Sequence, residues 1–296
     1  MPLFGETCAL ATAVLWSLTS MVFTSATMRV GAMLVNVARL AFALVFLGVS
    51  IALLGIPLPG NAAQLWKLSL SGVIGLAFGD TFLFLAFRRI GARVSMLIMA
   101  LAPPISALLA WFFLREALSG WDIAGVALTV CGIALVVLAR GDTGSAKGKL
   151  RFEGVLFAFL GAVGQAVGLI FAKSAFMDGD IDGFAAAFVR ISVASILLLP
   201  IAMFLPGWRN PFRAFARDSR ALFLTAVGSI FGPYLGITLS LLSIAHTDVG
   251  VASAIMATPP IIMLPMVHIA WKERIGLRAV AGAFLAVAGV AVLFLR

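Results

Sequence analysis

The chain repeats itself after 157 residues, and this duplication limits the folds that are open to it. Ile98-Met99-Ala100 recurs as Ile255-Met256-Ala257, and Pro103 recurs as Pro260, without a gap between the two copies. The same spacing relates several glycines, which pair as Gly75 with Gly232, Gly79 with Gly236, Gly125 with Gly282, and Gly132 with Gly289. The sequence therefore predicts two structurally similar halves.

Both halves are too apolar for a water-soluble surface. Charged residues make up 11% of the chain and hydrophobic residues 62%, whereas soluble domains carry about 25% charged residues. Runs of around 20 apolar residues, enough to cross about 30 Å of hydrocarbon, recur throughout. Ten runs are predicted, at 6–26, 33–54, 65–86, 94–114, 121–139, 153–175, 183–204, 221–243, 249–270 and 277–295. The runs are too continuous for barrel strands, so they indicate transmembrane helices.

Five helices in each half have a topological consequence. A Gly-rich polar stretch at 141–152 separates a first repeat, 1–140, from a second, 153–296. Because five is odd, the second repeat enters the membrane from the opposite face. The sequence therefore predicts two inverted five-helix repeats, with a site near the membrane midplane between them, as in many transporters.

The net charge of +9 is unevenly distributed over the predicted loops. Fifteen Lys and Arg residues fall on one side of the membrane and four on the other. By the positive-inside rule the basic side is cytoplasmic, which makes 141–152 a cytoplasmic linker and places both termini outside. This pattern explains the basic charge without a nucleic-acid partner and favours the inner membrane of a cell.

The residues around the helix junctions resemble a known family. Pro104, then Trp111 to Glu116, then Gly125 and Gly132 resemble the signature of the EamA-type permeases of the drug/metabolite transporter superfamily, and Pro260 begins a second copy. The resemblance covers the whole chain. It implies ten helices in two inverted repeats and export of small metabolites or amino acids, including aromatic amino acids.

Three ionisable residues are expected within the membrane, where charge is costly and usually functional. Arg39 and Asp80 lie at similar depths, about 9 Å from the cytoplasmic side at ~1.5 Å per residue, so they can form an ion pair or a gate. Arg190 holds the corresponding place in the second half, but the counterpart of Asp80 is Ile237. Arg190 is left to pair with Asp178, Asp180 or Asp182, or to bind a carboxylate.

Polar and aromatic residues inside apolar helices are the candidates for a substrate cavity, because ligand pockets combine apolar walls with a few hydrogen-bonding groups. They are Trp16, Ser17, Ser20, Asn36, Phe78, Phe82, Gln165, Tyr234 and Thr238. We expect Trp16 and Phe82 to face Gln165 and Tyr234 across the cavity. Core packing is the alternative for each of them.

Prolines within the runs predict helix kinks, which can expose backbone carbonyls to a cavity. They are Pro103, Pro104, Pro233, Pro259 and Pro260.

The sequence predicts neither a metal nor a cofactor. Asp178, Asp180 and Asp182 resemble the start of an EF-hand loop, but its twelfth position holds Val189 instead of Glu. An exporter of small metabolites, best matched to hydrophobic or aromatic amino acids, is the favoured function. A sugar-phosphate or nucleotide-sugar exchanger, a membrane enzyme and a non-transporting receptor are the alternatives. The oligomeric state stays open and is compatible with a monomer.

Overall fold

The computed structural model describes residues 3–114, 119–141, 152–204, 210–246, 252, 255–272 and 276–294. Over these residues the fold is helical and contains no strand. The first half holds α1 (Phe4–Val30), α2 (Ala32–Leu54), α3 (Ala62–Ser71), the π-helical segment η1 (Gly72–Gly79), α4 (Asp80–Met99), α5 (Ala102–Leu114) and α6 (Gly120–Gly141). The second half holds α7 (Phe152–Met177), α8 (Gly183–Phe204), α9 (Pro211–Arg217), α10 (Ser219–Ser229), the π-helical segment η2 (Ile230–Gly236), α11 (Ile237–His246), α13 (Pro259–Trp271) and α14 (Leu277–Phe294).

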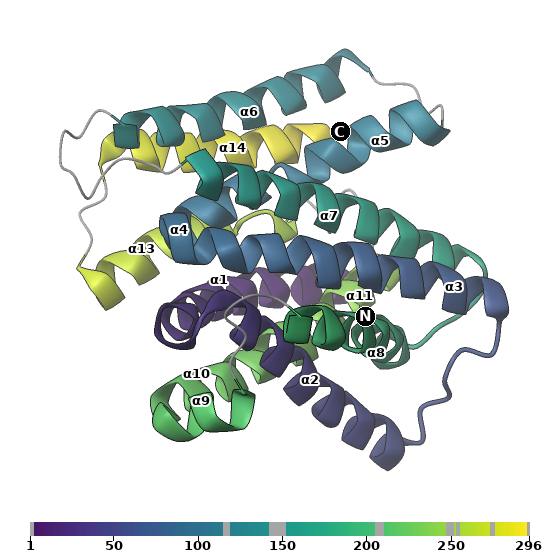
Figure 1. The fold of residues 1–296 in the computed structure, drawn as a ribbon. Coiled ribbons are helices and arrows are strands. Elements are labelled where there is room, and N and C mark those ends of the chain that lie inside the picture. Colours follow the sequence, from purple (N-terminus) through teal and green to yellow (C-terminus); the bar gives the residue numbers. More distant parts are fainter. Residues whose placement is uncertain are drawn as a thin grey trace.

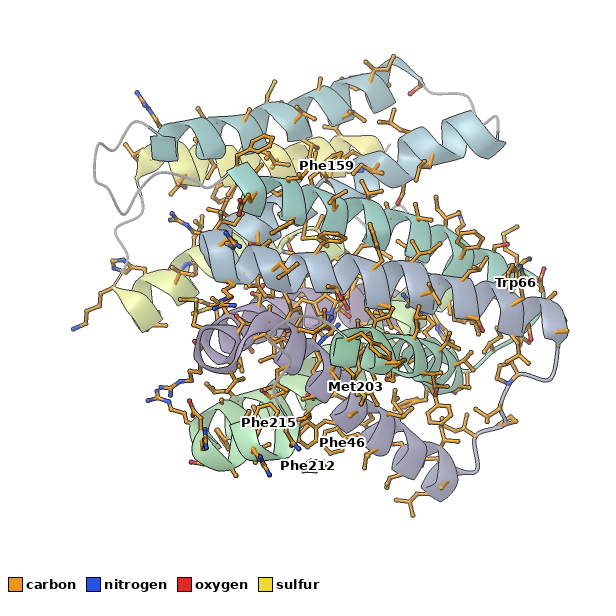
Figure 2. The ribbon with its side chains drawn as sticks, in the orientation of Figure 1. Phe46, Trp66, Phe159, Met203, Phe212 and Phe215 are labelled. Atoms are coloured by element: carbon orange, nitrogen blue, oxygen red, sulfur yellow. The ribbon has the colours of Figure 1, made fainter. Side chains whose placement is uncertain are left out.

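The outside of the bundle is apolar, as lipid contact requires. Six stretches of the described chain are long and apolar enough to span a membrane, namely Phe4–Val30, Ala32–Leu54, Ala62–Met99, Phe152–Met177, Gly183–Phe204 and Ser219–His246. Trp66 and Met203 are 63% and 60% exposed, and Figure 2 shows Trp66 at the outer edge of the bundle, on α3. An exposed apolar surface of this kind marks a membrane contact. The prediction of an all-helical membrane protein is confirmed.

Each half contains a broken helix, and the break corrects one prediction. The predicted run 94–114 is interrupted after Met99 and restarts as α5 at Ala102, and in the second half α13 starts at Pro259. Pro103 and Pro104 therefore lie in the first turn of α5, as Pro259 and Pro260 do in α13. They do not kink a helix interior, because proline is tolerated where the missing N–H would be unpaired anyway.

The third membrane helix of each half contains a π-helical segment, and the two segments lie at equivalent places. η1 ends at Gly79 and η2 ends at Gly236, which are 157 residues apart. Pro233 lies inside η2, whereas η1 has the same π-helical form without a proline. Gly91 then turns the chain with a φ of 78°, a value that favours glycine, and bends α4 towards the first break.

Glycines set how closely the two halves approach each other. A Cβ atom built on Gly164 of α7 would lie 2.6 Å from the Cα of Gly79, and one built on Gly168 would lie 2.8 Å from the Cα of Gly75. The backbones of α7 and η1 are therefore in direct contact, as the G-x-x-x-G spacing predicts. Figure 1 shows α6 and α14 side by side at one edge, where Gly132 and Gly282 bring their backbones together.

Candidate functional site

A cavity of about 190 Å³ lies where the two halves meet. For seven of its lining residues in the first half, the residue 157 positions later also lines the cavity. These pairs are Leu76 with Pro233, Asp80 with Ile237, Leu83 with Ser240, Met99 with Met256, Ala100 with Ala257, Ala102 with Pro259, and Pro103 with Pro260. The cavity is thus built from the repeated part of the sequence and lies between its two copies.

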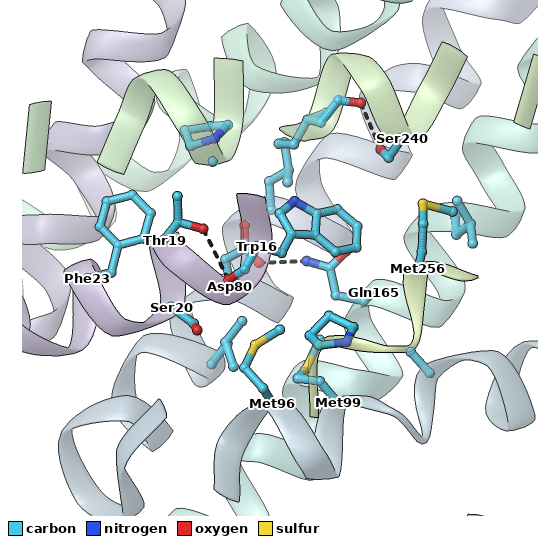
Figure 3. Close-up of a pocket in the computed structure, with 18 of the residues that line it drawn as sticks. Trp16, Thr19, Ser20, Phe23, Asp80, Met96, Met99, Gln165, Ser240 and Met256 are labelled. Atoms are coloured by element: carbon cyan, nitrogen blue, oxygen red, sulfur yellow. Dashed lines mark hydrogen bonds between the residues drawn. The ribbon is translucent and has the colours of Figure 1, made fainter. Parts of the chain in front are cut away.

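A polar network occupies one wall of this cavity. The Arg39 guanidinium donates from Nη2 to Oδ2 of Asp80 and from Nε to Oδ1 of Asn36, the latter at 2.9 Å. Gln165 donates from Nε2 to the other carboxylate oxygen of Asp80 at 2.6 Å (Figure 3). Asn36 in turn donates to Thr81 at 2.9 Å. The network ties α2, α4 and α7 together.

The ion pair between Arg39 and Asp80 is almost completely buried. The side chains of Arg39 and Asp80 are only 6% and 7% exposed. Phe84 adds a cation–π contact, with its ring centroid 4.7 Å from the Arg39 Cζ. A buried pair needs partners of this kind to offset the cost of taking two charges out of water. The matching depths of Arg39 and Asp80 in the sequence thus correspond to a contact in the structure.

Arg190 reaches the same cavity from the other half. It is the eighth residue of α8, as Arg39 is the eighth residue of α2. Only 5% of Arg190 is exposed, and its Nε atom has no hydrogen-bond partner within the described part of the chain. Asp80 attracts it electrostatically, but no carboxylate among the described residues forms an ion pair with it at 4 Å or less.

The acidic loop does not supply the partner that was one of the predicted possibilities for Arg190. Asp178 instead pairs with Lys67 at 2.6 Å, and Asp182 accepts a hydrogen bond from the backbone N–H of Phe184 at the start of α8. Asp180 is exposed and forms no ion pair with Arg190 among the described residues. Arg190 therefore remains a cation that faces the cavity.

The rest of the cavity is apolar and is lined by flexible side chains. Trp16 of α1 lines it beside Gln165, and Met96, Met99 and Met256 contribute thioethers (Figure 3). Methionine is flexible and polarizable, and makes favourable contacts with aromatic rings. This wall fits an apolar or aromatic group, while the polar network and Arg190 fit a charged or polar one.

The structure brings together some of the predicted cavity residues. Trp16, Ser20 and Gln165 line the cavity, with Arg39, Asp80 and Arg190 and with Pro103, Pro233, Pro259 and Pro260. The sequence pattern did not indicate the methionines or Ile237 as cavity residues, although the repeated Ile-Met-Ala tripeptide contains two of the methionines.

Other predicted residues lie away from the cavity, and two of them correct the expected arrangement. Phe82 packs against Phe78 and Phe157, and Phe78 is 43% exposed on the outside. The Tyr234 hydroxyl is 2.7 Å from the Ser50 hydroxyl, and the ring packs on Phe46. Phe82 and Tyr234 therefore do not face Trp16 and Gln165.

Three smaller polar residues also make local contacts and do not line the cavity. Ser17 donates to the backbone oxygen of Ala13 at 2.7 Å, and Thr238 donates to that of Tyr234 at 2.6 Å. Asn36 supports Arg39 from behind. Backbone bonding of this kind satisfies a hydroxyl inside an apolar helix without any ligand.

Comparison with solved structures places the fold among known ones. A protein described as "Crystal structure of protein" is similar over 98% of this chain and 97% of its own, with a TM-score of 0.69 and 21% identity. At that identity the likeness concerns the fold alone.

One curated relative is similar in sequence over a shorter segment. It is the "Probable terminal-alkyne amino-acid exporter" of Streptantibioticus cattleyicolor, 32% identical over 106 residues. The match spans 36% of this chain and 35% of that relative's length.

The family comparison covers nearly the whole chain. The EamA-like transporter family matches it twice, over residues 3–138 and 152–295, in agreement with the duplication and with the multi-pass helical fold. A transporter family with this architecture accounts for the resemblance noted in the sequence. The chain therefore belongs to the EamA-like transporter family.

Proposed function

We propose that the protein exports small metabolites across the inner membrane, and that its substrates are amino acids with hydrophobic or aromatic side chains. The observation that carries the proposal is the cavity between the repeats, which joins a methionine and tryptophan wall to a buried charged network. Such a site fits a solute with one apolar and one ionic end. The name of the curated relative, an amino-acid exporter, supports the same class.

The mechanism that fits this architecture is alternating access between two inverted five-helix repeats, 1–140 and 153–296. Rocking of similar halves about a site on their shared axis closes one face of the membrane while it opens the other. The paired helix breaks at the cavity are suitable hinge positions, because a break can absorb a change of backbone angles. The proposal needs ten membrane helices, with the part of α4 after Gly91 and α5 together forming a broken fourth one.

Flux measurements with the purified protein in liposomes test this function. We expect uptake of labelled phenylalanine, leucine or methionine above that of empty liposomes, and competition among them. A phosphate-bearing substrate is less suited to the site, because one of its two guanidiniums is already paired with Asp80. Transport of sugar phosphates with no transport of any amino acid would replace the proposal with the exchanger alternative.

Substitution of the cavity wall should alter selectivity. Trp16→Ala removes an aromatic surface, and an aromatic contact contributes about 0.5–1.5 kcal/mol beyond area burial, so aromatic transport should fall by roughly twofold to tenfold. Gln165→Ala removes a hydrogen bond to Asp80 and should also depress transport. Flux of phenylalanine is measured against that of alanine, whose transport should change less.

Phe82→Ala is the control for this experiment. Phe82 lies near the same depth as the network but packs outward on Phe78 and Phe157. It should retain wild-type selectivity. If Trp16→Ala behaves like Phe82→Ala, the aromatic wall is not part of the substrate site.

The orientation in the membrane is a separate prediction, based on the unequal loop charges. A reporter that is active only in the cytoplasm should function when inserted in the 141–152 linker or within 205–220. It should be inactive at the C-terminus. Activity in the reverse pattern would contradict the positive-inside assignment and the cytoplasmic linker.

A further inference from the structure

We propose that Arg190 binds the carboxylate of the transported solute, which supplies the anion that the second half does not contribute among the described cavity-lining residues. This inference rests on the proposed transport function and names the chemical group that the cavity recognises. It follows from a difference between the two halves. Arg39 and Arg190 are each the eighth residue of the second helix of their half, and Asp80 and Ile237 are related by the 157-residue spacing.

In the first half the arginine of the second helix has a carboxylate. Arg39 pairs with Asp80, which is the first residue after η1. In the second half the equivalent arginine is Arg190, and the first residue after η2 is Ile237. Both Arg190 and Ile237 line the cavity. The duplicated architecture thus keeps the cation and omits its anion on one side.

The charges that line the cavity do not balance. Arg39, Asp80 and Arg190 are its only ionisable residues among those described, giving two cations and one anion. Both oxygens of Asp80 are already engaged, one by Arg39 and the other by Gln165. A buried unpaired cation is costly in an apolar site, so an incoming anion gains more there than it does in water.

The position of Arg190 leaves its guanidinium available to a ligand. Its backbone is fixed against η1, because a Cβ built on Gly72 would lie 2.3 Å from the Arg190 carbonyl oxygen. Its Nη2 atom is 3.4 Å from the Cβ position of Gly75, so glycine leaves room for the planar group. Nε is buried without a partner. An arginine held in this way can offer two parallel N–H donors to one carboxylate.

The apolar wall indicates what is attached to that carboxylate. Trp16 and the methionines leave space for a small apolar or aromatic group, within a cavity of about 190 Å³. The solute is therefore a small carboxylate with an apolar body. Its carboxylate occupies the second half of the cavity in the role that Asp80 has in the first.

The test compares ligands that differ only at the carboxyl group. Liposomes containing wild-type protein are assayed with phenylalanine and with phenylalaninamide, whose amide is neutral. We expect wild type to prefer the acid by about tenfold or more, since charge-assisted hydrogen bonds are roughly twice as strong as neutral ones. Arg190→Gln should abolish this preference, and Arg190→Lys should restore part of it because it keeps the charge without the fork.

Arg213→Gln is the matched control, because it removes one exposed guanidinium on α9 that is not among the lining residues. It should retain the preference for the acid. The ratio of the two ligands is the decisive quantity, because a general loss of fold lowers both fluxes together. A preference that survives in Arg190→Gln, or that wild type never shows, overturns the assignment of Arg190 while leaving the exporter in place.

A binding measurement covers the case in which amino acids are not transported at all. Thermal unfolding of the detergent-purified protein is followed with 3-phenylpropionate and with 3-phenylpropanol. Stabilisation of wild type by the carboxylate alone, lost in Arg190→Gln and kept in Arg213→Gln, supports the carboxylate site even if amino-acid flux fails. Equal stabilisation by both compounds, or by neither, contradicts it.

Discussion

Replacement of Asp80 by asparagine is expected to lower the free energy of unfolding by about 3–5 kcal/mol, the usual effect of removing one partner of a buried ion pair. Asp80 is 5% exposed and is the only carboxylate among the described cavity residues. Without it, Arg39 and Arg190 share an apolar cavity with no anion. Folded yield in detergent and thermal unfolding measure the loss.

Asp178→Asn is the comparison variant, because it also removes a carboxylate from an ion pair. The Asp178 side chain is 27% exposed and pairs with Lys67 near the surface, where such pairs contribute about 0–1 kcal/mol. The two variants therefore separate a buried charge from an exposed one. Equal losses in both would contradict the buried network.

A double substitution tests whether Arg39 and Asp80 act as one unit. Adding Arg39→Gln to Asp80→Asn removes the stranded cation and should recover part of the lost stability. A double variant whose loss is the sum of the two single losses would show that the residues are uncoupled. Every variant that lacks the Asp80 carboxylate also loses its electrostatic attraction for Arg190, so full recovery is not expected.

The sequence predicted the parts of the fold that lipid and duplication determine. Long apolar runs require helices, and the common spacing of the Ile-Met-Ala tripeptides and the glycines requires similar halves. The pairing of Arg39 with Asp80 was accessible too, because two opposite charges at one depth in a membrane have few other partners. These features depend on spacing and on the cost of charge, which a sequence displays directly.

The direction in which each helix faces was not accessible in the same way. A soluble helix shows its buried side by an apolar stripe, but a membrane helix is apolar on the lipid side and on the packed side alike. The sequence therefore predicts Phe82 and Tyr234 on the cavity, although they pack elsewhere. Met99 and Met256 were overlooked because an apolar residue in an apolar helix carries no mark of its own.

The proline pairs show a related ambiguity. Proline inside a long apolar run signals either a kink or the start of a new helix, since its missing N–H is compatible with both. Pro103 and Pro260 lie in the first turns of helices because the chain just before α5 and α13 leaves the helical path. A tight turn precedes each start, with Leu101 donating to the Ile98 carbonyl at 3.0 Å and Thr258 to the Ile255 carbonyl at 3.1 Å.

Substitution of Gly164 by alanine is expected to destabilise the protein by about 1–3 kcal/mol, the usual cost of overpacking. The new Cβ would lie 2.6 Å from the Gly79 Cα and 2.9 Å from the Ile74 carbonyl oxygen. Both obstacles are backbone atoms, so no side chain can move aside. The helix α7 must separate from η1, and Gln165, the next residue, must retreat from Asp80.

Gly48→Ala is the matched control in another membrane helix. Its Cβ would meet only a ring carbon of Phe188 at 3.6 Å, an ordinary contact, and alanine favours a helix by about 1 kcal/mol over glycine. Gly48→Ala should therefore be neutral or stabilising in thermal unfolding, while Gly164→Ala loses both stability and transport. If Gly164→Ala behaves like Gly48→Ala, then α7 and η1 are not in backbone contact. The hydrogen bond from Gln165 to Asp80 would then lose its structural basis, because that contact sets the distance between the two side chains.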